Sequence, residues 1–240
     1  MGKLNNLYRN VRAGTPVTSD DLMVLGVSAD LAVHYVRAGW LTRLARGVFA
    51  RPHTPLDLHA SLRLLEHRLD GMHVGGKTAL DWQGVRHHVA QHPQLQLYGW
   101  SSGSLPTWFT KNFPSTYRRQ RLFDEQPGAL LRVSRLQRQA GGPLVSAPER
   151  AVLEMLSDVG FRQPLQEARD LLEAAPSLRA AVLQELLAQC RQVKTVRLCL
   201  TLGREMGLPW FAKLNPKRLP TGSQQRWVGH SKEGLLVLKA

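Results

Sequence analysis

The chain has 240 residues, 43% of them apolar, which is enough for one large core or two modest ones, and we expect a small domain followed by a larger one. No stretch approaches the roughly 20 uninterrupted apolar residues of a membrane span, and the first residues lack the apolar core of a signal peptide, so we expect a cytoplasmic protein with no membrane partner. Only Cys190 and Cys199 occur, which excludes a disulfide framework and a zinc ribbon and predicts two buried thiols.

The formal net charge of +14 favours binding to a polyanion through counterion release, most commonly a nucleic acid, although anionic membrane surfaces attract similar patches. Residues 1–55 carry seven Lys and Arg against three Asp and Glu. Residues 190–240 carry ten against two, and the acidic residues 149–189 lie between them. The chain therefore has two possible basic sites that are far apart in sequence.

Local patterns predict three short helices at the N-terminus. Residues 3–12 have apolar side chains at helical spacing. A second helix, capped by Ser19, ends at Gly26, and a third runs from Ser28 to Ala38. The tight turn between the last two predicts a helix-turn-helix.

Two short strands are expected next. Residues 40–44 and 48–50 are β-like, and the turn between them contains Gly47, where a positive φ is needed. This hairpin predicts a wing, so residues 1–55 are interpreted as a winged helix-turn-helix DNA-binding domain.

The third helix offers a surface for reading DNA. With Ala32, Tyr35 and Val36 turned inward, the opposite face would enter the major groove, where Arg37 could bond guanine or phosphate and Asp30 could accept from cytosine. Arginines of the wing would hold phosphates or enter the minor groove. The alternative is a solvated surface on a helix-turn-helix that contacts protein. The residues predicted to bind DNA are Ala29, Asp30, Val33, His34 and Arg37 on the helix and Arg43, Arg46 and Arg51 on the wing.

Residues 56–240 predict a larger domain of the α+β class. A helix with an apolar stripe covers residues 58–69. A small sheet is expected over about 72–145 and a helical bundle over about 146–207. The apolar run at residues 235–238 is expected to form one strand that pairs back onto this sheet. The strands of the sheet are expected at residues 95–100, 117–123 and 130–133.

Residues 71–78 match the phosphate-loop pattern GxxxxGK[ST]. Such a loop must follow a buried apolar strand, whereas residues 62–69 predict an amphipathic helix. An NTP-binding enzyme that uses Lys77 is therefore kept only as an alternative.

The chain shows no arrangement that predicts catalysis. His87, His88 and His92 could hold a metal on a helix, but no carboxylate or thiol completes the set and Pro93 breaks the helix. We therefore predict no catalytic residues, no metal and no cofactor.

Several segments resemble one known family. Residues 18–28, 38–41 and 46–49 resemble the N-terminal winged helix of AbiEi antitoxins. Residues 74–84 resemble the GG-x-x-AL…G segment of that family, and residues 146–153 resemble its S-x-P-E-R-A-L-L helix start.

The resemblance implies that the winged helix binds inverted repeats in its own promoter and represses the operon. The larger domain would counteract a nucleotidyltransferase-like toxin without forming a stable complex. An alternative is an RNA-binding protein that protects the toxin's target. The implied DNA contacts are Ser28, Ala29, His34, Arg37, Arg43 and Arg46, and the basic surface proposed for antitoxic activity contains Arg191, Lys194, Arg197 and Arg204, on one possible helix.

Overall fold

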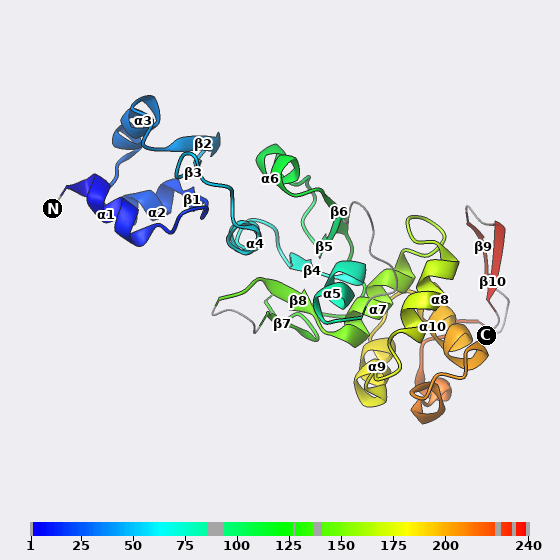
Figure 1. Ribbon diagram of the computed structural model, residues 1–240. Helices are drawn as coiled ribbons and strands as arrows, with labels where there is room; N and C mark the ends of the chain where they lie inside the picture. The colour runs from blue at the N-terminus through cyan, green and yellow to red at the C-terminus, as the bar shows by residue number, and fades with distance from the viewer. Residues whose placement is uncertain are drawn as a thin grey trace. The chain divides into compact units, whose positions relative to one another are not determined.

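The computed structural model describes residues 2–85, 94–126, 128–136, 141–223, 227–231 and 234–238 (Figure 1). Helices and sheets occur in both parts of the chain, which confirms the α+β class. The chain divides into two compact units. The first unit comprises Met1–Leu69, Gly103–Pro114 and Leu136–Pro143, and the second comprises Asp70–Ser102, Ser115–Arg135 and Leu144–Ala240. The first unit thus continues beyond residue 55, where the sequence analysis placed its boundary.

The N-terminal part of the first unit contains three helices and a three-stranded sheet of order β1-β3-β2. Its core is built from Leu7, Leu22, Val27, Tyr35 and Phe49, all at most 8% exposed. The predicted helices and hairpin are present, and β1 adds a strand that the sequence did not reveal. The elements are α1 (Lys3–Asn10), β1 (Val17–Thr18), α2 (Ser19–Val24), α3 (Ala29–Arg37), β2 (Thr42–Ala45) and β3 (Val48–Ala50).

The cap of α2 differs from the prediction. Thr18, not Ser19, is the N-cap, because its hydroxyl accepts from Asp21 N at 3.1 Å while the Asp21 carboxylate accepts from Thr18 N at 2.8 Å. This reciprocal pair is a capping box with Asp in place of Glu. Ser28, where the third helix was expected to start, is the N-cap of α3 and accepts from Leu31 N.

Two further helices belong to the first unit: α4 (Leu58–Glu66) and α6 (Thr107–Asn112). Asp57 caps α4 by accepting from Ala60 N at 2.7 Å. The sequence analysis expected α4 but not α6, which lies within the region expected to form a sheet.

The second unit is built around a mixed five-stranded sheet of order β6-β5-β4-β8-β7. The pairs β5–β6 and β4–β8 are parallel, and the pairs β4–β5 and β7–β8 are antiparallel. Helix α5 (Gly76–Trp82) follows β4 directly and was not predicted. The strands are β4 (His73–Val74), β5 (Leu95–Gly99), β6 (Ser115–Arg119), β7 (Val133–Arg135) and β8 (Leu144–Ser146).

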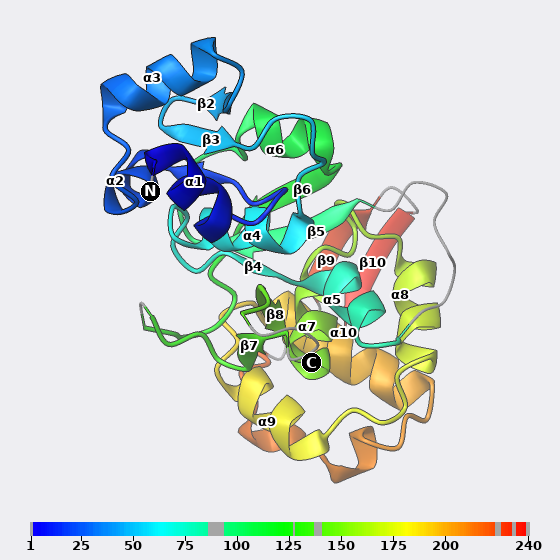
Figure 2. The same ribbon diagram turned by 60° about the vertical axis from the view of Figure 1, so that its left-hand side comes forward.

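Four helices follow the sheet, close to the range predicted for the bundle. Helix α7 is buried from Glu149 to Ser157 and contacts α5, α8, α9 and α10 (Figure 2). The thiols of Cys190 and Cys199 are buried as predicted, and burial raises the pKa of Cys190 to about 11. The helices are α7 (Pro148–Ser157), α8 (Leu165–Glu173), α9 (Ala180–Ala188) and α10 (Val193–Glu205), followed by the 3-10 turns η1 (Phe211–Lys213) and η2 (Pro216–Arg218).

The prediction that the C-terminal strand pairs back onto the sheet was wrong. Strand β10 (Gly234–Leu238) pairs with β9 (Trp227–Ser231) as an antiparallel hairpin and does not join the five-stranded sheet. A local partner a few residues away costs less loop-closure entropy than a distant sheet edge. No helix among the described residues is both long and apolar enough to cross a membrane.

Candidate nucleic-acid interface

Two glycines fix the ends of the helices that carry the candidate interface. Gly26 has φ +81° and lets Val27 N donate back to Leu22 O at 2.9 Å, which ends α2. Gly39 has φ +76° and lets the chain turn back after α3. Left-handed backbone of this kind is favourable only for glycine and a few polar residues, so the sequence sets both turns.

The hairpin β2–β3 is joined to the helices by one backbone and one side-chain hydrogen bond. Ser19 N at the start of α2 donates to Gly47 O in the hairpin turn at 3.1 Å. The Tyr8 hydroxyl of α1 donates to Trp40 O, just before β2, at 2.9 Å. These contacts hold the hairpin turn beside the start of α2.

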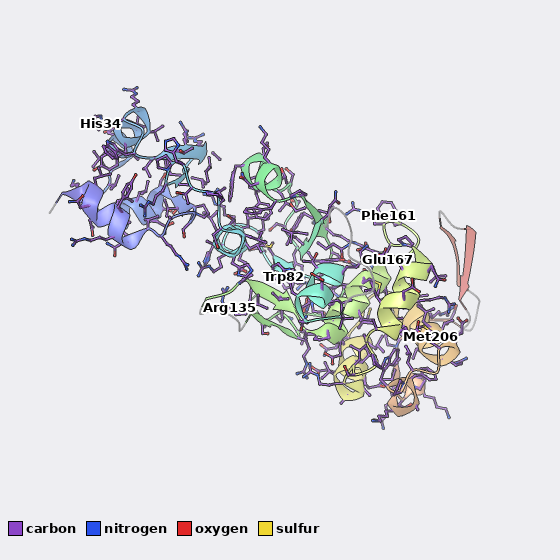
Figure 3. The ribbon with its side chains drawn as sticks, viewed as in Figure 1. His34, Trp82, Arg135, Phe161, Glu167 and Met206 are labelled. Atoms are coloured by element: carbon purple, nitrogen blue, oxygen red, sulfur yellow. The ribbon has the colours of Figure 1, made fainter. Side chains whose placement is uncertain are left out.

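The outer face of α3 is exposed as the helical spacing predicted. Ala32 and Tyr35 are buried, Val36 is half-buried, and Val33 is 44% exposed. Figure 3 labels His34 on this helix. The remaining predicted residues on this helix, Ser28, Ala29, Asp30, His34 and Arg37, are also exposed. The structure therefore presents one polar and basic helix face that also carries the apolar side chains of Ala29 and Val33.

A groove of about 350 Å³ runs between α2, α3 and the hairpin. Its floor is apolar, and two cations, Arg37 of α3 and Arg43 of β2, lie on its lining. It brings together five of the predicted DNA contacts: Ser28, Ala29, Val33, Arg37 and Arg43. It also includes Ser19, Gly47 and Phe49, which the sequence analysis did not select because only the folded hairpin places them beside α3. Asp30, His34, Arg46 and Arg51 are not part of the lining.

The charges of this region are uncompensated. Among the described residues, Arg37, Arg43 and Arg46 make no ion pair or side-chain hydrogen bond, and all three are exposed. Asp30 lies in the first turn of α3, where the helix dipole favours a carboxylate. Three free guanidinium groups on a small exposed surface can accept a polyanion without first breaking internal pairs.

Arg51 is placed differently from the other arginines. Its guanidinium lies 4.1 Å from the centre of the Tyr8 ring, and Nη1 donates to the carbonyl oxygens of Tyr8 and Val11 at 3.4 and 3.3 Å. The side chain is half-buried and joins β3 to the end of α1. The structure thus gives Arg51 an internal contact instead of a place beside the groove.

The second predicted basic surface does not form. Arg197 is only 3% exposed and donates to the carbonyl oxygens of Thr221, at 2.6 Å, and Ser223. Lys194 is half-buried and donates to Val159 O. Helix α10 is buried from Thr195 to Leu200 and again at Leu202 and Gly203, so the protein itself covers part of the helix face that carries residues 194, 197 and 204.

The other two members of this predicted set lie apart. Arg191 precedes α10 and pairs with Asp124 at 2.6 Å. Arg204 is exposed near the end of α10, and its guanidinium lies 5.8 Å from the Phe211 ring. The prediction of one basic surface on one helix was therefore wrong.

The segment that matches the phosphate loop is occupied by the protein's own groups. Gly76 N donates to Glu154 Oε2 at 3.2 Å, and Lys77 N donates to Gln96 Oε1 at 2.7 Å. The Lys77 ammonium pairs with Glu167 at 2.7 Å. Strand β4 lies inside the motif, not before it as in a true phosphate loop. The backbone donors that would hold a phosphate are therefore already used.

Glu154 is the centre of a buried polar network. Its carboxylate accepts from His73 Nε2 at 2.8 Å, Arg150 Nε at 2.7 Å and Ser146 Oγ at 2.9 Å. Arg150 also pairs with the buried Glu125. Burial raises the pKa of Glu154, but the charges and hydrogen bonds of His73 and Arg150 outweigh it and lower the pKa to about 2. The network is closed and fully buried, which is typical of a structural role.

The histidines 87, 88 and 92 and Pro93 lie outside the described residues. Among the residues that are described, no group of three His, Cys, Asp or Glu side chains could hold a metal ion.

Comparisons with known proteins give one family. A model described as the N-terminal domain of the AbiEi antitoxin transcriptional regulators matches residues 1–91. A second model, described as a transcriptional regulator, AbiEi antitoxin, of a type IV toxin–antitoxin system, matches residues 92–239. The chain is also similar in fold to the crystal structure of the RV2827C protein from Mycobacterium tuberculosis, with 17% identity, a TM-score of 0.55, and coverage of 94% of this chain and 87% of that one. No curated protein matches the chain.

Proposed function

Because the chain belongs to the AbiEi antitoxin family of transcriptional regulators of type IV toxin–antitoxin systems, we propose that its N-terminal part is a winged helix-turn-helix domain that binds double-stranded DNA. The observation that carries this proposal is the groove between α3 and the hairpin, with Arg37 and Arg43 on its lining and no acidic partner for either among the residues that the structure describes. Helix α3 is the reading helix and the β2–β3 hairpin is the wing.

The two elements have different tasks in this proposal. Helix α3 enters the major groove, where Arg37 and His34 donate to base edges and the exposed Val33 contacts a thymine methyl group. Arg43 and Arg46 of the hairpin hold the DNA backbone, and Ser28 and Ala29 lie at the end of α3 that approaches it. Asp30 restricts the sequence, because a carboxylate is repelled by phosphates and accepts from cytosine.

In biological terms, the protein binds inverted repeats in its own promoter and represses the operon. The second unit counteracts a nucleotidyltransferase-like toxin encoded in the same operon, without a stable complex. Two observations support separate roles for the two units. The chain belongs to the antitoxin family, and every residue that lines the groove belongs to the first unit.

A mobility-shift assay with the promoter DNA of the operon tests DNA binding. At moderate salt, the full chain should bind this duplex at least a hundredfold more tightly than a scrambled duplex of equal length. Equal affinity for the two duplexes would remove the proposal of sequence-specific repression.

A rescue assay separates the antitoxic activity from DNA binding. The full chain with Arg37→Ala and Arg46→Ala should lose promoter binding and still restore growth to cells that express the toxin. If the double variant keeps its fold, measured by circular dichroism, and no longer rescues growth, the two activities are not separate.

A further inference from the structure

The second unit contains a cavity of about 450 Å³ that neither the DNA-binding proposal nor the family description uses. It is lined by Arg118, Ser157, Phe161, Gln192, Val193 and Lys194. Its volume lies within the range of sites that bind small molecules. We propose that this cavity binds a nucleotide, with its phosphate on Arg118 and Lys194 and its base against the ring of Phe161.

Two cationic side chains, Arg118 and Lys194, lie on the lining of the cavity. Arg118 pairs with the buried Asp158, which is the one carboxylate beside it among the described ion pairs. Lys194 donates to a backbone carbonyl oxygen, Val159 O. Both side chains line the same cavity; burial lowers the pKa of Lys194, and repulsion by the charge of Arg118 lowers it further. An anion between them would relieve this repulsion.

The start of α10 adds further donors. Gln192 is the N-cap of this 13-residue helix, and Val193 and Lys194 are its first residues, so the positive end of the helix dipole faces the cavity. The Gln192 side-chain oxygen accepts from the Thr195 hydroxyl at 3.1 Å. Its amide NH₂ has no partner among the described residues and remains a donor for a phosphate or ribose oxygen.

Phe161 distinguishes a nucleotide from a simple anion. It lies in the turn between α7 and α8, is labelled in Figure 3, and is 68% exposed, the most exposed of the large aromatic side chains in the described chain. The guanidinium of Arg162 lies 5.4 Å from its ring. An exposed aromatic ring beside a cationic cavity is the arrangement on which nucleobases stack. Ser157 also lies on the lining, and its hydroxyl is within hydrogen-bond distance of Glu154 O, at 2.6 Å, and of Gln120 Oε1, at 3.1 Å.

Isothermal titration calorimetry of the full chain tests the proposal. The probes are adenosine 5′-monophosphate, adenosine, inorganic phosphate and a ten-nucleotide single-stranded RNA, at about 0.3 M salt to weaken binding that is purely electrostatic. The monophosphate should bind at least tenfold more tightly than adenosine or phosphate. No binding of the monophosphate or the RNA at millimolar concentration, or equal binding of inorganic phosphate, would overturn the proposal.

Variants locate the site. Phe161→Ala, on an exposed side chain that leaves the core intact, and Lys194→Gln should each weaken nucleotide binding about tenfold. Lys217→Gln removes a charge from the same unit outside the cavity and should leave the affinity within twofold. Lys77→Gln should also leave the nucleotide affinity unchanged. A loss of affinity in this variant would place the nucleotide at α5 and would refute the proposal that it binds in the cavity. Unchanged affinity in Phe161→Ala refutes the stacking on which the proposal rests.

The same experiment identifies the source of the nucleotide. If the RNA binds more tightly than the monophosphate and the monophosphate competes with it, the ligand is the end of a polynucleotide chain. If the two bind equally, the ligand is a free nucleotide. In both cases the binding must weaken in Phe161→Ala.

Discussion

Gly76 N donates a hydrogen bond to Glu154 Oε2 at 3.2 Å, so a carboxylate of the protein occupies the start of α5. Residues 74–84 and 146–153, the two segments of the second unit that resemble the AbiEi family, come together around this residue through Gly76, Ser146 and Arg150. What looks like a phosphate loop is therefore an internal anion site of the fold.

The buried carboxylate predicts acid sensitivity. The pKa of Glu154 is about 2 in the folded chain, below its ordinary value of 4.5, so its stabilising effect is complete above about pH 4.5 and is lost as the pH falls from there towards 2. At about 1.4 kcal/mol per pKa unit, the effect is on the order of 3 kcal/mol. Urea unfolding of the native chain and of Glu154→Gln should differ by this order at neutral pH, and the difference should shrink below pH 4.5. A difference that does not depend on pH would contradict the role of the charge.

Gly75 is expected to tolerate no side chain. Its backbone is extended, so alanine brings no strain in φ, but an added Cβ would overlap the Glu154 carboxylate and lie 2.6 Å from Tyr98 Cδ2. Gly75→Ala should lower the free energy of unfolding by about 1–3 kcal/mol. Gly103→Ala, where an added Cβ has open space, is the matched control and should change it by less than about 0.5 kcal/mol. Equal effects in thermal unfolding would show that the contact with Glu154 is not tight.

The proposed DNA interface predicts different losses for two arginines. Arg37→Ala should reduce discrimination between the promoter and a scrambled duplex, at a cost of about 1–3 kcal/mol for the promoter. Arg46→Ala should weaken both duplexes by a similar factor and reduce the slope of log affinity against log salt by about 1. Titrations at several salt concentrations measure both quantities, and the reverse pattern would exchange the two roles.

Arg51 is expected to act on stability more than on DNA binding. Arg51→Ala removes its hydrogen bonds to Tyr8 O and Val11 O and its contact with the Tyr8 ring. The free energy of unfolding of the N-terminal unit should fall by about 1–3 kcal/mol. The salt dependence of DNA binding, measured below the unfolding transition, should stay as in the native chain. A slope reduced as in Arg46→Ala would place Arg51 on the DNA.

Sequence reasoning worked best where structure is decided within a few residues. Helix α3 begins at Ser28 because a hydroxyl caps its first turn, and α2 and α3 stop near Gly26 and Gly39 because both glycines adopt positive φ. The same reasoning from neighbouring residues did not predict α5. Two consecutive glycines, Gly75 and Gly76, indicate a loop, and the sequence does not show that both lie against Glu154 in the fold.

The sequence by itself determined the order of helices and hairpin at the N-terminus, the exposed face of α3 and the net charge of +14. Only the tertiary structure decided which cations remain free. Arg37, Arg43 and Arg46 have no internal acceptor in the described chain, whereas Arg150 and Arg197 are buried against carboxylates or carbonyl groups. The physical reason is that a sequence shows which residues are charged but not which of them are paired. The groups that neutralise a charge come from distant segments that folding brings together.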